Sequence, residues 1–300
     1  MTEVSGRPLR TVLVDAERRL AAAEVPSPRA DAELLLAHVL GVTRGHLVLS
    51  EEVDRTALVR FESLLAKRAS RQPLQHLVGQ APFRYGTVAV GRGVFVPRPE
   101  TEIVAEAAIR LLRESPHRLV VDLCSGSGAL GLSLAVEVPG TTVHLVEVDA
   151  AALPWLQRNV ADYADRIDAA GSLVLVHHAD AGLVHEGALT AIVGTVDLVT
   201  CNPPYIPDGA FPRDPEVREY DPAAALYGGT DGLDVVRAVA VSAAALLRPG
   251  GVLVMEHGDA QGQSAGELGV PAVLRAAGYL DVLDRVDLAG RDRYTLASRA

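Results

Sequence analysis

The chain has 300 residues, of which 49% are hydrophobic, and it carries a formal net charge of -10 with a pI near 5.4. This size suffices for one large α/β domain and a small accessory domain, and the acidic balance disfavours a broad nucleic-acid-binding surface. The sequence lacks the roughly 18 consecutive apolar residues of a membrane span, a secretion signal and the cysteines of a disulfide framework, so we expect a cytoplasmic protein.

Residues 1–80 have the pattern of a small helical bundle. Ser27-Pro28 marks the start of one helix, and an apolar stripe from Val53 to Leu65 predicts another. The first helix has apolar residues at helical spacing: Leu9, Val12, Leu13, Ala16 and Leu20.

Residues 81–97 predict a β-hairpin that connects this bundle to a larger domain over residues 98–300. We expect its strands at Tyr85–Val90 and Val94–Val96, with the turn at Gly91–Gly93.

Arg98 lies between Pro97 and Pro99, at the start of the larger domain. Its guanidinium is a candidate for the rim of a substrate pocket. In a structural alternative, Glu100 or Glu102 pairs with Arg98 or caps the next helix.

A strand, a glycine-rich loop and a helix are predicted next. The run Leu119–Leu123 is apolar enough for a buried strand, and the glycines Gly126 and Gly128 in the following loop allow a ligand to approach the backbone. With Gly131 they match G-x-G-x-x-G, which alone would suggest a dinucleotide. Asp122 in the strand adds a negative charge that better suits a cationic ligand, such as a sulfonium or an amino group.

A second buried strand, Val143–Asp149, ends in a carboxylate 21 residues after Gly128. A carboxylate at this place can accept both hydroxyls of a ribose, so we expect Asp149 to be the ribose ligand. The alternative is that Asp149 caps a helix around Leu153 to Val160. Glu147 is expected to face elsewhere.

A third strand, Leu173–Asp180, also ends in an acid. Asp180 is either a ligand of an adenine amino group or a carboxylate in a surface turn. His177 and His178 would face opposite sides of this strand and have no ligand at metal spacing nearby, so no metal site is predicted.

The fourth strand, Val196–Cys201, is followed by Asn202-Pro203-Pro204-Tyr205. The two prolines stiffen the turn, so the side-chain oxygen of Asn202 and the carbonyl of Pro203 can be aimed together at the NH2 of a planar amide or ring. Tyr205 can lie against the face of that group and contribute on the order of 1 kcal/mol. The alternative is a stiff turn that leaves a buried strand, but the flanking Asn and Tyr favour catalysis.

The rest of the chain predicts a mobile loop and the end of a sheet. Asp208–Asp221 is a long irregular segment, either a lid or a surface insertion. A strand at Val252–Glu256, a helix at Val270–Ala277 and a hairpin of Leu280–Asp287 with Arg293–Ser298 follow.

These strand ends together indicate a methyl transfer to nitrogen. Ligands of open α/β sheets gather at the carboxyl ends of the strands, and S-adenosylmethionine fits a glycine loop with a ribose carboxylate and an acceptor clamp. The main alternative is a nucleic-acid methyltransferase that acts on an exocyclic amine of adenine or guanine, whose flipped base the clamp could hold. A non-catalytic cofactor-binding partner is a third possibility, but it would not need Asn202.

The chain resembles the release-factor glutamine methyltransferases of the PrmC/HemK type over nearly its whole length. Besides Asn202–Tyr205, the stretches that carry the resemblance are Pro73–Gly79, Phe95–Glu102, Asp122–Gly128, Gly228–Leu233, Leu247–Gly251, Glu256–Gly258 and Gln261-Gly262.

The resemblance implies a cytosolic enzyme that uses S-adenosylmethionine to methylate the glutamine side-chain amide in the Gly-Gly-Gln loop of class I release factors, with no stable nucleic-acid or membrane partner. Its fold would be a Rossmann-like sheet with helices on both faces and a C-terminal antiparallel hairpin. The bundle would help to grip the release factor, or would simply stabilise the enzyme.

The resemblance also implies roles for individual residues. Asn202 would touch cofactor and substrate, and Pro203, Pro204 and Tyr205 would complete the glutamine pocket. The cofactor would be contacted by Cys124, Ser125, Gly126, Ser127, Gly128 and Asp149.

Two positions depart from the family pattern. Ala181 stands after the third-strand acid, where a bulky residue is common, so adenine stacking there is weaker or comes from another residue. Cys124 stands where glycine is common. If the first and fourth strands are neighbours, the thiols of Cys124 and Cys201 lie close together.

Overall fold

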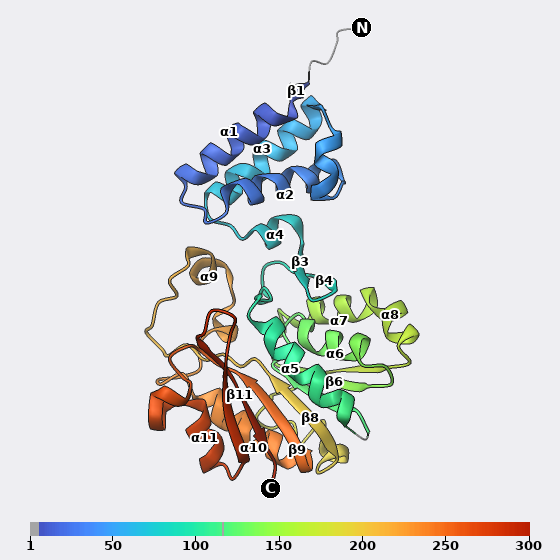
Figure 1. Cartoon of the computed structure of the whole chain (residues 1–300), viewed down its shortest axis with the longest axis vertical. Helices are drawn as coiled ribbons and strands as arrows, with labels where there is room; N and C mark the ends of the chain where they lie inside the picture. The colour runs from blue at the N-terminus through green and yellow to red at the C-terminus, as the bar shows by residue number, and fades with distance from the viewer. Residues whose placement is uncertain (1–5, 116) are drawn as a thin grey trace. The chain divides into compact units, whose positions relative to one another are not determined.

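The computed structural model describes residues 6–115 and 117–300, which form two compact units. The first unit comprises the chain up to Gln80 together with Pro212–Tyr220, and the second comprises Ala81–Phe211 and Asp221–Ala300 (Figure 1). Each is described separately below.

The first unit is helical, as its apolar periodicity predicts. Pro28 occupies the first turn of α2, Gly41 ends that helix in the left-handed conformation with φ +68°, and Asp54 caps α3 by accepting from Ala57 N at 2.9 Å. Leu20, Leu35, Leu36, Phe61 and Leu65 form the centre of its core. Its elements are β1 (Arg7–Pro8), α1 (Leu9–Ala22), α2 (Pro28–Leu40), η1 (Arg44–Leu49), β2 (Glu52–Val53), α3 (Arg55–Ala69), α4 (Leu74–Val78) and α9 (Pro215–Tyr220).

Helix α9 lies inside the segment for which the sequence predicts irregular structure. That part of the prediction is wrong, because Pro215 starts a short helix within Asp208–Asp221.

The connecting hairpin exists, but the predicted positions of its strands and turn are wrong. Strand β3 (Gln80–Phe83) pairs with β4 (Gly86–Ala89), and the turn falls at Arg84, whose φ is +52°. Val94 and Val96 are buried in the hydrophobic core instead of forming a second strand. The alternating apolar residues at these positions therefore reflect the burial of one side of an irregular segment.

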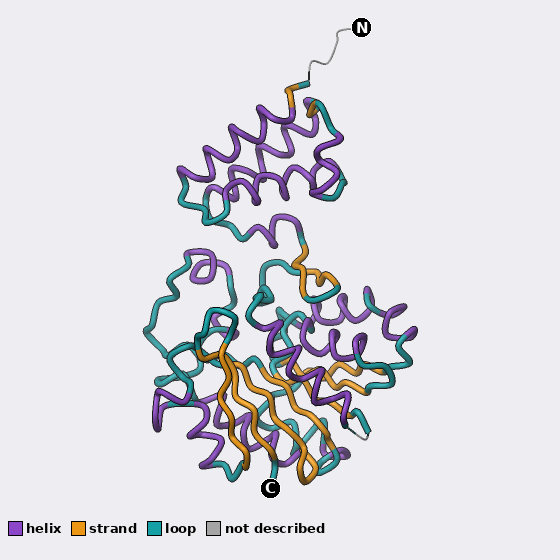
Figure 2. The backbone as a smooth tube through the Cα atoms, in the orientation of Figure 1, coloured by secondary structure: helices purple, strands orange, loops and turns teal. Residues whose placement is uncertain are grey.

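The second unit contains a seven-stranded sheet of order β10-β11-β9-β8-β5-β6-β7 (Figure 2). Strands β5 to β9 run parallel, and β11 pairs antiparallel with β9 and β10, which confirms the predicted sheet and its C-terminal hairpin. The strands are β5 (Leu119–Leu123), β6 (Thr142–Glu147), β7 (Leu173–His178), β8 (Val196–Cys201), β9 (Leu247–Glu256), β10 (Leu280–Val286) and β11 (Asp292–Ser298).

Helices cover both faces of this sheet, as predicted (Figure 1). Alternate side chains of a strand point to opposite faces, so Val120 joins the core under α5, α6 and α7, and Val121 joins the core under α10 and α11. The remaining helical elements of this unit are α5 (Thr101–Glu114), α6 (Ala129–Glu137), α7 (Leu153–Asp162), α8 (Ala164–Ala169), η2 (Thr190–Ile192), η3 (Ala223–Ala225), α10 (Asp234–Leu246), η4 (Gln263–Leu268) and α11 (Val270–Ala276).

The strand order reverses between β5 and β8. From β5 the sheet continues through β6 and β7 on one side, and β8 adds on the other side. Loops that leave the carboxyl ends of two such strands diverge, and the crevice between them is the usual ligand site of open α/β sheets.

Candidate active site

The strand register places the glycine loop beside the Asn-Pro-Pro-Tyr clamp. Leu123, the last residue of β5, pairs with Cys201, the last residue of β8, so Cys124 and Asn202 are the first residues beyond adjacent strand ends. The sequence left the adjacency of the first and fourth strands open, and the sheet order establishes it.

Hydrogen bonds from the neighbouring strand fix the glycine loop, Cys124–Gly128. Ser125 N donates to Val146 O at 2.9 Å, and Val146 N donates to the Ser125 hydroxyl at 3.0 Å. Gly126 and Gly128 have φ of +55° and +82°, and no described atom would lie within 4 Å of a Cβ on Gly126. The backbone there is thus open to a ligand, as a cofactor loop requires.

Glu147 is a site residue that the sequence analysis missed. Its carboxylate accepts from Gly126 N at 2.8 Å and from Asp149 N at 2.7 Å, so the expectation that it faces elsewhere is wrong. This side chain links the glycine loop to the predicted ribose ligand. A buried acid at the end of an apolar strand was the available signal, because such a group needs partners.

Asn159 is a second missed residue. It is fully buried on α7, donates to Ser127 O at 2.9 Å and to Ala89 O at 3.0 Å, and accepts from Ala89 N at 2.7 Å. A polar side chain on the apolar face of a predicted helix was the signal here.

Asp122 lies behind the loop with both carboxylate oxygens engaged. Thr200 Oγ1 donates to one oxygen at 2.7 Å, and Gly131 N donates to the other at 3.2 Å. Burial raises the pKa of Asp122 to about 7 despite these hydrogen bonds. The group therefore titrates near neutrality, and its predicted attraction for a cationic ligand depends on pH.

Asp149 is half-buried just beyond β6, where the sequence places it. Its carboxylate accepts from Ala151 N at 2.8 Å, and its carbonyl accepts from Leu153 N at 3.0 Å. The N-cap position of α7 is taken by Ala152, so the side chain orders the turn before the helix and does not cap it. The ribose role stays a prediction.

Asp180 is exposed and accepts from Gly182 N at 2.8 Å, which is the hydrogen bond of a local turn. Ala181 is buried in the core under α10. Both remain predicted cofactor contacts.

The clamp is surrounded by backbone at close range. Gln261 Nε2 donates to Tyr205 O at 3.0 Å. A Cβ on Gly228 would lie 2.5 Å from Pro204 O, and a Cβ on Gly232 would lie 2.3 Å from Tyr205 O. These glycines and Gln261 belong to stretches that carry the family resemblance, and the contacts explain why those residue types stand there.

Tyr205 is held as a neutral phenol. Burial, with the nearby Glu256 carboxylate, raises the pKa of Tyr205 to about 12. Pro203 and Pro204 are buried and Asn202 is half-buried. The prolines therefore pack against other parts of the protein, and the asparagine is partly accessible. The partly accessible amide oxygen of Asn202 can accept a hydrogen bond from an NH2 group.

Arg98 pairs with Asp221 at 2.5 Å, and its guanidinium lies 4.8 Å from the centre of the Phe95 ring. The expected pairing with Glu100 or Glu102 is wrong, because Glu100 meets Arg291 at 3.4 Å and Glu102 accepts from Arg84 N at 3.2 Å. Glu100 is at the N-cap position of α5, but its side chain makes no capping bond in the described structure.

The two cysteine thiols are neighbours, as predicted for adjacent first and fourth strands. Burial, together with a hydrogen bond to Cys124, raises the pKa of the Cys201 thiol well above its usual value. Cys124 has a φ of +59°, a conformation that favours glycine, which explains why glycine is common at this position in the family.

His177 packs against His144, with ring nitrogens 2.9 Å apart, and His178 contacts Val148 O at 3.1 Å. Within residues 6–115 and 117–300, no group of three or more His, Cys, Asp or Glu side chains could hold a metal ion. In the same ranges, no helix is both long and apolar enough to cross a membrane.

Two known domain types match parts of the chain. Residues 11–79 match the PrmC N-terminal domain, and residues 87–211 match the methyltransferase small domain. A release factor glutamine methyltransferase from Mycolicibacterium smegmatis is 47% identical over 97% of this chain and 98% of that protein. One from Streptomyces coelicolor is 44% identical over 96% of this chain and 97% of its own length.

Among solved structures, the T. thermophilus 16S rRNA N2 G1207 methyltransferase in complex with AdoMet and guanosine is 26% identical, with a TM-score of 0.51. The match covers 74% of this chain and 50% of that one. The acceptor nitrogen of that enzyme belongs to a guanine base of rRNA.

Proposed function

Because the chain belongs to the release factor glutamine methyltransferases, we propose that it methylates the side-chain amide nitrogen of the glutamine in the Gly-Gly-Gln motif of peptide chain release factors. The methyl donor is S-adenosylmethionine, which supplies an electrophilic methyl group when bound.

The observation that carries the proposal is the pairing of Leu123 with Cys201. This register brings the end of the glycine loop and Asn202 to the same edge of the sheet, next to each other. A donor bound on one loop and an acceptor held by the other therefore share one place, which is the positional contribution that a displacement at carbon needs.

The cofactor side is formed by the loop backbone and two acids. Gly126 leaves the backbone open, Asp149 offers a carboxylate to the ribose hydroxyls, and Glu147 holds both in place. Asp180 and Ala181 are proposed for the adenine end, where Asp180 would accept from the amino group.

The acceptor side is formed by Asn202, Pro203, Pro204 and Tyr205. The amide oxygen of Asn202 and the carbonyl of Pro203 would each accept one N–H of the glutamine carboxamide, and Tyr205 would pack against its face. An amide nitrogen is a weak nucleophile because its lone pair is delocalised into the carbonyl. Holding both N–H bonds favours the pyramidal nitrogen of the transition state, so the clamp acts on turnover more than on binding.

The rival acceptor is an exocyclic amine of a nucleic-acid base, as in the rRNA enzyme named above. The clamp chemistry suits both acceptors. The net charge of -10 and the full-length relatives support a protein acceptor.

Label transfer tests the proposal. The enzyme is incubated with methyl-labelled S-adenosylmethionine and either an intact release factor, the same factor with its Gly-Gly-Gln glutamine changed to alanine, or total RNA and DNA. We expect label on the intact factor alone. Label on nucleic acid without label on protein would reverse the choice of acceptor.

A further inference from the structure

The segment Pro212–Tyr220 begins seven residues after Tyr205, the last residue of the clamp. In the sequence it lies between Phe211 and Asp221, both of which belong to the methyltransferase unit. Its own contacts nevertheless assign it to the helical unit formed by the N-terminal chain. The chain that leaves the clamp thus enters the helical unit and then returns.

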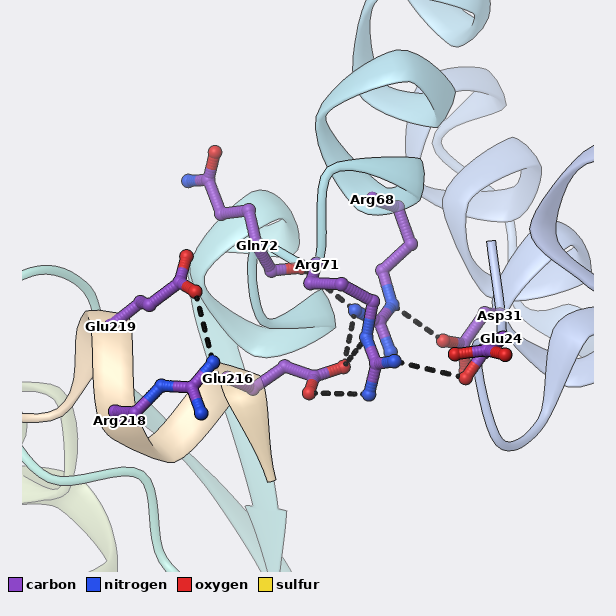
Figure 3. A network of polar contacts seen from close by, with 8 residues as sticks. All are labelled: Glu24, Asp31, Arg68, Arg71, Gln72, Glu216, Arg218 and Glu219. Carbon is purple, nitrogen blue, oxygen red and sulfur yellow. Dashed lines mark hydrogen bonds and ion pairs between the residues drawn. The ribbon is translucent and has the colours of Figure 1, made fainter. Parts of the chain in front are cut away.

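An ion-pair network holds this segment on the helical unit. Glu216 on α9 accepts from Arg71 Nε at 2.8 Å and from Arg71 Nη2 at 2.7 Å, one hydrogen bond on each carboxylate oxygen. Arg68 Nη1 also donates to Glu216, at 2.9 Å. Figure 3 shows the Glu216 carboxylate facing both guanidinium groups. A two-pronged arginine–carboxylate pair fixes orientation as well as distance.

Arg68 and Arg71 each have a partner besides Glu216. Arg68, whose side chain is only 6% exposed, also pairs with Asp31 at 2.7 Å and donates to Gln72 O at 3.1 Å. Arg71 also donates to Glu24 O at 3.0 Å. Both arginines would keep a partner if Glu216 lost its charge.

Polar contacts dominate the attachment of α9. Every residue of α9 is half-buried or exposed, so little apolar burial fixes the helix. A second contact comes from Tyr220, whose ring meets His76 edge to face with centroids 6.4 Å apart. Glu216 therefore provides the charged attachment of the segment, and Tyr220 adds a ring contact.

Both flanks of the segment are fixed within the methyltransferase unit. Upstream, Asp208 N donates to Gly229 O at 2.9 Å, beside the glycines that surround the clamp. Downstream, Asp221 pairs with Arg98 of the Pro-Arg-Pro motif. Only Gly209–Phe211 separate the upstream flank from Pro212, and an extended chain of that length spans roughly 14 Å at most. A short covalent connection thus joins the backbone next to the clamp to the segment that Glu216 holds.

We propose that Glu216 is a positioning residue for the acceptor. By holding Pro212–Tyr220 on the helical unit, it makes turnover at the clamp depend on a substrate that also binds this unit. This inference rests on the proposed function. It implies that specificity for the intact release factor over an isolated Gly-Gly-Gln peptide depends on the network of Arg68, Arg71 and Glu216.

The test compares Glu216→Gln with wild type on two substrates, an intact release factor and a short peptide that contains the Gly-Gly-Gln loop. We expect kcat/KM for the intact factor to fall about tenfold, because the substitution removes the charge that strengthens the hydrogen bonds between Glu216 and the arginines. We expect kcat/KM for the peptide and the Kd of S-adenosylmethionine to change less than about twofold, because the clamp and the glycine loop keep their own supports. The melting temperature is recorded for each variant.

Two further variants serve as controls. Glu219→Gln removes a charge from the same helix and should match wild type, because the exposed Arg218, at 3.5 Å, is the ion-pair partner of Glu219 among the described residues. Arg71→Gln removes the two-pronged partner of Glu216 and should give the same selective loss on the intact factor.

Three results would overturn the inference: an unchanged kcat/KM of Glu216→Gln on the intact factor, equal losses on factor and peptide, or an Arg71→Gln variant that matches wild type on the intact factor. Failure of wild type to methylate the intact factor would instead overturn the proposed function.

Discussion

The glycine loop and the clamp lie beyond adjacent strand ends, yet they are held in opposite ways. In the glycine loop, side chains reach the backbone: Glu147 accepts from Gly126 N, and the Ser125 hydroxyl accepts from Val146 N. At the clamp, close backbone packing accompanies a hydrogen bond from the Gln261 side chain to Tyr205 O, because an added Cβ on Gly228 or Gly232 would lie 2.5 Å from Pro204 O or 2.3 Å from Tyr205 O.

This difference follows from what each region must do. A glycine loop that a ligand must approach closely needs partners on the neighbouring strand that fix its backbone, as Glu147 and Val146 do. A turn made of two prolines has few donors to offer, so it is fixed by close packing around its carbonyls. Changes at the two regions should therefore separate cofactor binding from turnover.

Asn202→Ala should give the largest effect. It removes one acceptor for the substrate NH2 and leaves the loop supports in place, so we expect kcat to fall about 10²- to 10³-fold. The Kd of S-adenosylmethionine, measured by calorimetry, should change much less. A comparable loss in both quantities would show that the two regions are not separable.

Gly232→Ala should reduce kcat next most. Its Cβ would lie 2.3 Å from Tyr205 O, so the clamp must shift by about 1 Å, which can cost up to roughly 100-fold in rate. Gly278→Ala is the matched control, because Gly278 also has a left-handed φ, +87° against +75°, but no described atom lies within 4 Å of its added Cβ. If both variants lose equal activity, backbone strain and not the contact with the clamp is responsible.

Glu147→Gln should weaken cofactor binding about tenfold with a smaller change in kcat. The amide keeps one acceptor oxygen for the two N–H groups of Gly126 and Asp149, and one donor loses its partner. Titration calorimetry with S-adenosylmethionine measures the change, and the exposed Glu267→Gln serves as the control. Unchanged affinity would mean that the loop is fixed without this carboxylate.

Asp122→Asn should affect turnover least and the pH dependence of stability most. The folded-state pKa of Asp122 is raised to about 7 by burial, so the folded protein holds an extra proton and loses stability as pH rises from about 4 to about 7. Asparagine can accept from Gly131 N and donate to Thr200 without this titration. The free energy of unfolding, measured by denaturant titration, should therefore fall less steeply over this pH range, and an unchanged slope would assign the titration to other groups, such as Glu256.

The strands and the clamp could be predicted from the sequence because their signals are local. The apolar runs ending at Leu123 and Cys201 are the β5 and β8 strands to the residue, and the stiff Asn-Pro-Pro-Tyr turn follows directly. Parallel strands buried on both faces give continuous apolar runs, which is the clearest pattern available.

The missed features all depend on contacts between distant residues. Glu147 meets Gly126 across 21 positions, Asn159 meets Ala89 across 70, and Arg71 meets Glu216 across 145. Periodicity shows that a residue is buried but does not name its partner. The positions of the hairpin strands were wrong for the same reason, since the burial of Val94 and Val96 comes from core packing and not from a paired strand.

The ladder between β5 and β8 sets the spacing of two reacting partners in steps of one residue. A slip of that pairing by a single position would move the Asn202–Tyr205 turn by about 3.3 Å along the sheet relative to the glycine loop. This displacement is larger than the alignment of two reacting atoms tolerates. Substitutions that weaken the pairing of β5 with β8 would therefore lower turnover well before they unfold the domain.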